Sequence, residues 1–177
     1  MAHIPIDLPE QSVHIHAQRQ LVFEMISAMG APGGDKADNG KPVVLQQDGN
    51  RMLVRFNTPL KIGPISTTWT TTEWVTPNMP TAIDFELVPA NGVIAGGLRQ
   101  LNDHFEFEAQ DNCTVLKYKS RFGIRWSVGG WVLGKALFGP VIKKHMIEHL
   151  EEVKEMVENR AKRSRIHPQL ECSENDG

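Results

Sequence analysis

Residues 139–158 read GPVIKKHMIEHLEEVKEMVE, and their apolar side chains recur every three or four positions. At about 100° per residue, this spacing gathers them on one broad arc of an α-helix. The arc holds Val141, Ile142, Met146, Leu150, Val153, Met156 and Val157. The pattern predicts an amphipathic helix from Val132 to about Arg163, with one face packed against another element.

Six segments before this helix have the composition of strands. Turn signals such as Asp48-Gly49-Asn50 separate them, and the intervals are too short for crossover helices. The spacing therefore predicts an antiparallel meander. The six segments are Val43–Gln47, Met52–Thr58, Ile65–Thr76, Thr81–Val88, Leu98–Ala109 and Thr114–Phe122.

The beginning of the chain adds a strand and a short helix. Residues 12–17, SVHIHA, alternate as in a half-buried strand, and residues 18–29 change to helical spacing. Residues 30–42 hold four Gly and two Pro, which predicts a mobile loop. The order predicts an α+β fold, with a seven-stranded antiparallel sheet curved around a long C-terminal helix. We expect a single domain over residues 1–162 and a disordered polar tail over 163–177.

Composition excludes several classes of protein. The chain has 177 residues, 40% hydrophobic and 23% charged, which is enough for one core without a metal or disulfide staple. A net charge of −2 gives no overall electrostatic reason for nucleic-acid binding. The two cysteines match neither a metal-ligand spacing nor a dense disulfide framework. No signal peptide or apolar span is visible, so we expect a cytoplasmic protein.

The two ends of the predicted domain resemble a known superfamily. Residues 13–27, VHIHAQRQLVFEMIS, look like the first strand and helix entry of the START-like, or SRPBCC, superfamily, and residues 139–158 are similar to its final helix. This group includes lipid-transfer domains, polyketide cyclases and coenzyme Q-binding proteins. The resemblance implies a helix-grip fold and an internal cavity for an apolar ligand, without a fixed catalytic signature.

Strand alternation predicts which polar side chains face the core. In Leu98–Ala109, Arg99 and Asp103 share the parity of Phe105 and should point inward. Two interpretations stay open: charges that reach water at strand ends, or polar anchors for a ligand. The other inward candidates for the ligand site are Phe85, Tyr118 and Trp69, although the parity of the strand holding Trp69 is ambiguous.

Two histidines lie within the apolar arc of the final helix. His145 and His149 are one turn apart, and each is either a neutral core histidine or a hydrogen-bonding and acid–base group in a cavity wall. With Glu148 they also match the pattern H-x-x-E-H of some zinc peptidases. No plausible third ligand follows His149, so we expect neither a metal nor another cofactor.

Residues 126–142, WSVGGWVLGKALFGPVI, hold a single charge, Lys135. The segment is either the buried start of the last helix or an exposed apolar rim that contacts a membrane transiently. Trp131 within it is expected to line the cavity. The main functional prediction is binding or transport of a hydrophobic small molecule or lipid. The alternatives are a polyketide cyclase or aromatase that uses the cavity histidines, and an interaction protein whose interior is filled by side chains.

Overall fold

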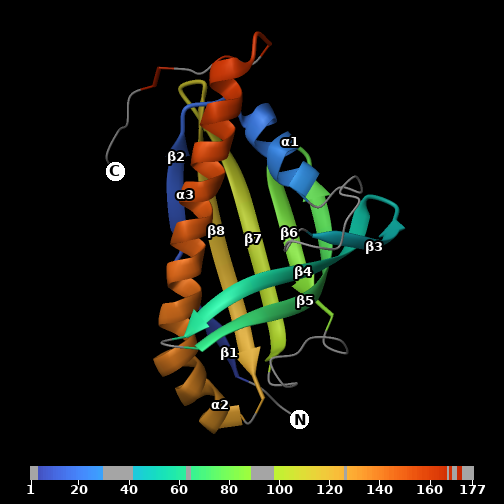
Figure 1. Ribbon diagram of the computed structural model, residues 1–177, viewed down its shortest axis with the longest axis vertical. Helices are drawn as coiled ribbons and strands as arrows, with labels where there is room; N and C mark the ends of the chain where they lie inside the picture. Colours follow the sequence, from blue (N-terminus) through green and yellow to red (C-terminus); the bar gives the residue numbers. More distant parts are fainter. Residues whose placement is uncertain are drawn as a thin grey trace.

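The computed structural model describes residues 4–29, 42–62, 65–88, 98–125, 127–166, 168, 171 and 172. Eight strands in these ranges form one antiparallel sheet in the order β1-β8-β7-β6-β5-β4-β3, with β2 also paired to β8 (Figure 1). The strands are β1 (Pro5–Asp7), β2 (Gln11–Ile15), β3 (Val43–Asp48), β4 (Arg51–Ile62), β5 (Ile65–Asn78), β6 (Ala82–Leu87), β7 (Leu98–Gln110) and β8 (Cys113–Ile124).

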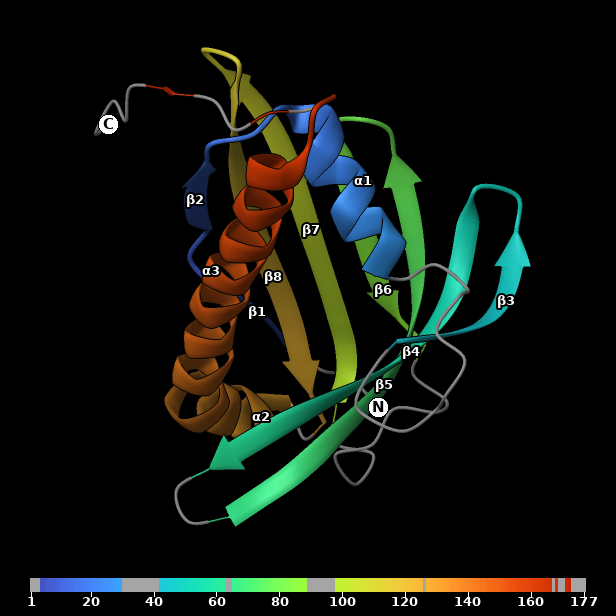
Figure 2. The same ribbon diagram turned by 45° about the horizontal axis from the view of Figure 1, so that its top comes forward.

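The helices lie on one side of the sheet. They are α1 (Arg19–Met29), α2 (Ser127–Leu133) and α3 (Gly139–Arg163), and a π-helical turn (Gly134–Phe138) joins α2 to α3. Figure 2 shows the sheet curving around α3, with α1 beside the C-terminal half of that helix. This arrangement confirms the predicted helix-grip α+β fold.

The boundaries differ from the predicted ones in two places. β1 adds a short eighth strand, because residues 5–7 pair with residues 121–123 of β8. The predicted final helix is divided by the π-helical turn, and it begins at α2 rather than at Val132. The predicted 30–42 loop lies outside the described residues except for Pro42.

The core divides into two clusters along α3. One cluster joins the C-terminal half of α3 to α1, β2 and the middle strands through residues such as Leu150, Phe23 and Phe107. The other joins the N-terminal half of α3 to β1 and the end of β8 through Met146, Ile6 and Phe122. Apolar surface removed from water along both halves therefore holds α3 against the sheet.

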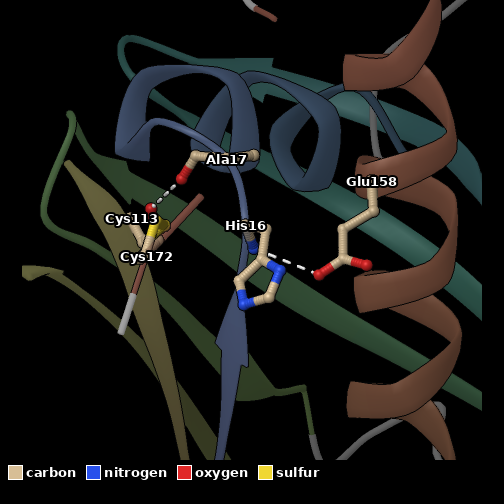
Figure 3. The surroundings of a disulfide bond; sticks show 6 residues. His16, Ala17, Cys113, Glu158 and Cys172 are labelled. Carbon is tan, nitrogen blue, oxygen red and sulfur yellow. Dashed lines mark hydrogen bonds between the residues drawn. A yellow bond between two sulfur atoms is a disulfide. The ribbon is translucent and has the colours of Figure 1, made fainter. Parts of the chain in front are cut away.

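A disulfide links the start of β8 to the C-terminal segment (Figure 3). It joins Cys113 to Cys172, whose Cα atoms are 6.2 Å apart. Beside it, the Thr114 hydroxyl donates a 2.8 Å hydrogen bond to the carbonyl of Ala17, and the His16 backbone N–H donates to Glu158 of α3 at 3.1 Å. These contacts fix the junction between β2 and α1 to both β8 and α3. Composition had offered no reason to pair the two cysteines.

None of the helices in the described ranges has the length and apolar character needed to cross a bilayer.

Candidate functional site

A cavity of about 440 Å³ lies between the sheet and α3. Its walls come from α1, from the inward faces of β4 to β8, and from the first half of α3, so it is bounded by members of both core clusters. Its lining residues include Ile26, Met52, Phe56, Thr71, Glu73, Val75, Ile83, Phe85, Leu101, Asp103, Phe105, Tyr118, Ile142, His145, Met146, Glu148, His149 and Glu152. Its volume falls within the range of about 300–1,000 Å³ common for small-molecule sites.

A row of aromatic rings forms one wall of the cavity. Ring centroids are 6.0 Å apart between Phe56 and Phe85, and 5.6 Å apart between Phe85 and Phe105. Phe105 stacks on Tyr118 at 4.3 Å and meets the edge of His149 at 5.9 Å. The row follows from the alternation of β4, β6, β7 and β8, which places every second side chain on the inner face. It offers a continuous apolar surface to a ligand.

Two carboxyl groups stand at the polar part of the cavity. Glu73 of β5 is buried, with 6% of its surface exposed. Asp103 of β7 accepts a 3.0 Å hydrogen bond at Oδ2 from the hydroxyl of Tyr118, which lies on the adjacent strand. Its other oxygen, Oδ1, is buried without a hydrogen bond of ordinary geometry in the described structure, although Ser120 faces Asp103 across the β7–β8 ladder.

Burial makes both carboxyls hard to ionise. Loss of solvation, reinforced by repulsion from Asp103, raises the pKa of Glu73 from 4.5 to about 7. Loss of solvation likewise raises the pKa of Asp103 from 3.8 to about 6, against the opposing effect of hydrogen bonding from Ser120 and Tyr118. Burial and the negative charge of Asp103 raise the pKa of the Tyr118 phenol well above 10. The carboxyls of Glu73 and Asp103 therefore change protonation state at about pH 6 to 7, while Tyr118 remains a hydrogen-bond donor.

Both predicted histidines of α3 line the cavity. His149 lies deeper, where burial lowers the pKa of its imidazole and the negative charge of Glu152 partly opposes this effect. His145 is one-third exposed, and its Nδ1 lies 3.5 Å from Oε2 of Glu148. The deeper histidine is therefore neutral at pH 7, whereas the outer one lies near solvent and a carboxylate.

Six of the nine predicted ligand-site residues line this one cavity: Phe85, Asp103, Phe105, Tyr118, His145 and His149. Trp131 instead packs against the core cluster at the start of α3, and Arg99 is not among the lining residues. The parity that grouped Arg99 with Asp103 is interrupted, because the ladder between β7 and β8 shifts register between Leu98 and Gln100. The side chain of Trp69 lies outside the described part of the structure.

Three residues of the cavity, Glu73, Glu148 and Glu152, are not among those predicted from the sequence. Glu73 shares the parity of Val75 on β5, which was the signal that could have found it. The two glutamates of α3 border the apolar arc rather than occupy it, so helix phase alone does not mark them as cavity residues. Both are exposed on α3 and contribute to the rim of the cavity.

The H-x-x-E-H pattern is not completed by a third ligand in the described residues. Within those ranges, no group of three or more histidine, cysteine or acidic side chains is arranged to hold a metal ion. His145 and His149 are neighbouring positions on the cavity-facing side of α3.

Comparison with known proteins relates the fold to solved structures of low sequence identity. No family model matches the chain, and neither does any curated protein sequence. The crystal structure of the Zhui aromatase/cyclase from Streptomyces sp. R1128 is similar with a TM-score of 0.66 and 15% identity, over 89% of this chain and 96% of that one.

Two further structures extend the likeness. A protein from Thermus thermophilus is similar with a TM-score of 0.68 and 13% identity, over 88% of this chain and 99% of that one. A START superfamily protein from Mycobacterium smegmatis is similar with a TM-score of 0.54 and 14% identity, over 88% and 99% of the two chains. These similarities show a START-like, SRPBCC-type fold, as the two ends of the sequence implied.

Proposed function

We propose that the protein binds a hydrophobic small molecule or lipid in the cavity between the sheet and α3. The observation that carries the proposal is the cavity itself, about 440 Å³ in volume and walled by a row of aromatic rings. A well-packed interior leaves few voids larger than a water molecule, so a space of this size is atypical of a filled core. An apolar ligand would bury surface that otherwise stays in contact with solvent.

The proposal is tested by filling the cavity with a side chain. N-Phenyl-1-naphthylamine, an uncharged dye at pH 7, should gain fluorescence when it binds the wild-type protein. Leu101 lines the cavity, so Leu101→Trp should weaken dye binding by about tenfold or more, which is 1.4 kcal/mol. The control Leu45→Trp adds the same ring at an exposed position on β3 and should bind like wild type.

Thermal melts show whether each variant is folded. If Leu101→Trp does not fold, Met52→Trp provides a second variant in which a tryptophan fills the cavity. Equal dye affinity in wild type and in a folded cavity-filled variant would rule out binding at this site. If the cavity-filled variant binds the dye more weakly, mass spectrometry of wild-type protein purified under native conditions would identify the chemical class of any molecule that it retains.

A second candidate is an enzyme of the cyclase or aromatase type. It is favoured by one arrangement, a carboxyl with a pKa of about 7 beside the hydrogen-bonded pair of Asp103 and Tyr118. A group that titrates near the working pH is suited to general acid–base catalysis on a bound carbonyl compound. This candidate requires a substrate that wild type converts, and that Glu73→Gln binds without converting.

We also propose a transient membrane contact through residues 126–142. Val128, Val132 and Leu137 are 63%, 54% and 61% exposed on α2 and the π-helical turn. Lys135 in the same segment is exposed as well. Apolar side chains next to a cation favour contact with an anionic lipid surface.

A further inference from the structure

The charges lining the cavity are of one sign. Glu73, Asp103, Glu148 and Glu152 contribute four carboxyl groups, accompanied by two imidazoles. Within the described residues, neither lysine nor arginine lines the cavity. The carboxyls also extend from the rim, where Glu148 and Glu152 are exposed, to the interior, where Glu73 is buried. A cavity with this distribution attracts cations and repels anions.

Among the described residues, no lysine or arginine lines the cavity beside the innermost carboxyls, those of Glu73 and Asp103. Buried acidic groups in proteins are normally paired with a cation or a metal, since an isolated buried charge is costly. Asp103 accepts a hydrogen bond from Tyr118 and also interacts with Ser120, while its buried Oδ1 has no hydrogen bond of ordinary geometry in the described structure. An unsatisfied buried oxygen in a cavity wall is suited to a donor supplied by a ligand.

The aromatic row lies next to these carboxyls. Tyr118, which donates to Asp103, is stacked on Phe105, and Phe105 leads on to Phe85 and Phe56. A ligand with a flat apolar body along the row could place a polar end group beside Asp103. The faces of aromatic rings also attract cations.

We propose that the ligand is an amphipathic amine, with its protonated amino group held by Glu73 and Asp103 and its apolar body lying along Phe105, Phe85 and Phe56. This inference rests on the proposed binding function and adds the chemical class of the ligand. An ammonium group donates hydrogen bonds and neutralises the charge of the carboxylates, whereas a neutral alcohol donates a hydrogen bond and neutralises no charge.

The protonation states fit this assignment. The raised pKa values of Glu73 and Asp103 mean that a bound cation would favour their ionised forms, so binding should release protons below about pH 7. The other titratable groups lining the cavity are Tyr118 on β8 and His145, Glu148, His149 and Glu152 on α3. Of these, the phenol stays protonated, and the exposed glutamates add negative charge to the rim.

Three probes with the same apolar body test the inference: 2-(2-naphthyl)ethylamine, 2-(2-naphthyl)ethanol and 2-naphthylacetic acid. Each is titrated into the full-length protein at pH 7.5, by calorimetry or by displacement of N-phenyl-1-naphthylamine. The amine should bind about tenfold or more tightly than the alcohol, since charge-assisted hydrogen bonds are about twice as strong as neutral ones. The acid should bind most weakly because of repulsion by the four carboxyls.

Two isosteric variants locate the amino group. Glu73→Gln and Asp103→Asn should each weaken amine binding by about tenfold while changing alcohol binding by less than about twofold. Glu86→Gln on β6 is the matched control, because its carboxyl is exposed, and it should leave all three affinities unchanged. Melting curves confirm that each variant is folded, and the comparison of probes on wild type does not depend on any variant.

The outcomes separate this inference from the proposed function. If the alcohol binds as tightly as the amine, or if the dye binds and the amine does not, the amine assignment is wrong while cavity binding stands. If the amine binds more tightly but neither isosteric variant weakens it, its amino group lies elsewhere and the assignment is also wrong. If neither the dye nor any probe binds, the proposed function itself fails.

Discussion

Glu73 lies on β5 with its carboxyl buried and subject to repulsion from Asp103, and both groups hold their protons more strongly than free carboxyls do. In such a case the folded chain binds more protons than the unfolded one near pH 5 to 6. Stability must then fall as pH rises through that range. The two carboxyls thus lower the stability of the unliganded protein at neutral pH, which is consistent with a site kept for binding rather than for folding.

Replacing Glu73 with glutamine should change how stability depends on pH. The folded pKa of about 7 lies above the unfolded value of 4.5, so the contribution of Glu73 is fully favourable below 4.5 and is lost by about pH 7. Glu73→Gln removes this loss of stability. The loss is at most about 3 kcal/mol, because each unit between the folded and unfolded pKa values corresponds to about 1.36 kcal/mol. Denaturant unfolding at pH 4.5 and pH 8 should show the variant gaining stability over wild type only at the higher pH.

Glu86→Gln is the control for this measurement, since Glu86 is exposed on the neighbouring strand. Its stability difference from wild type should be the same at both pH values. A Glu73→Gln profile parallel to that of wild type would show that Glu73 ionises normally, and it would remove the electrostatic support for both the amine site and acid–base catalysis.

Predicting from the sequence which side chains face the cavity required knowing which alternate positions of each strand point inward. Asp103 was assigned to the inner face because Phe105 and Phe107 follow it at alternate positions, and it does line the cavity. Glu73 was missed because β5 is rich in threonine, which is compatible with either face of a sheet. Arg99 was assigned with Asp103, but a register shift separates them, and nothing in the local composition marks that shift.

At the scale of elements, the entry into α3 depends on two glycines. A Cβ placed on Gly130 of α2 would lie 2.9 Å from the carbonyl oxygen of Ile124 and even closer to that of Arg125. A Cβ on Gly134, at the start of the π-helical turn, would lie 2.7 Å from Ile6. These close approaches explain why the apolar segment turns sharply after β8. Gly130 and Gly134 thus permit tight packing that no larger residue would allow.

Gly129 and Gly130 form a matched pair for testing this packing. Gly129→Ala meets no atom within 4 Å and should stabilise the protein by about 0.5–1 kcal/mol, as alanine does in an open helical position. Gly130→Ala meets backbone oxygens that cannot rotate away, and should destabilise by about 1–3 kcal/mol or more. Equal stabilities in denaturant unfolding would show that α2 does not pack against the end of β8 in this way.

At the scale of the whole molecule, the fold was predictable because its signals are local. Alternation marks the strands, three- to four-residue spacing marks α3, and turn residues exclude crossover helices. The cavity is a different kind of feature, since its volume is what remains after distant side chains have packed. Helix phase placed His145 and His149 towards the sheet, but only the assembled fold shows the space beside them. The same holds for Trp131, whose ring packs near the start of α3 rather than in the cavity wall.

The end of the molecule that carries α2 (Figure 1) includes three exposed apolar side chains, those of Val128, Val132 and Leu137. Lys143 and Lys144 of α3 are exposed, as is Lys135, so cations accompany the exposed Val128 and Val132. We therefore expect the protein to sediment with phosphatidylserine vesicles more than with phosphatidylcholine vesicles, and less so as salt is raised. Val132→Glu should reduce binding to the anionic vesicles several-fold, because it places a negative charge within the apolar surface.

Met79→Glu is the control, because it adds the same charge at an exposed apolar position in the turn after β5. Its binding to the anionic vesicles should fall much less. Equal losses in both variants would mean that net charge alone governs the interaction and that residues 126–142 are not the contact surface.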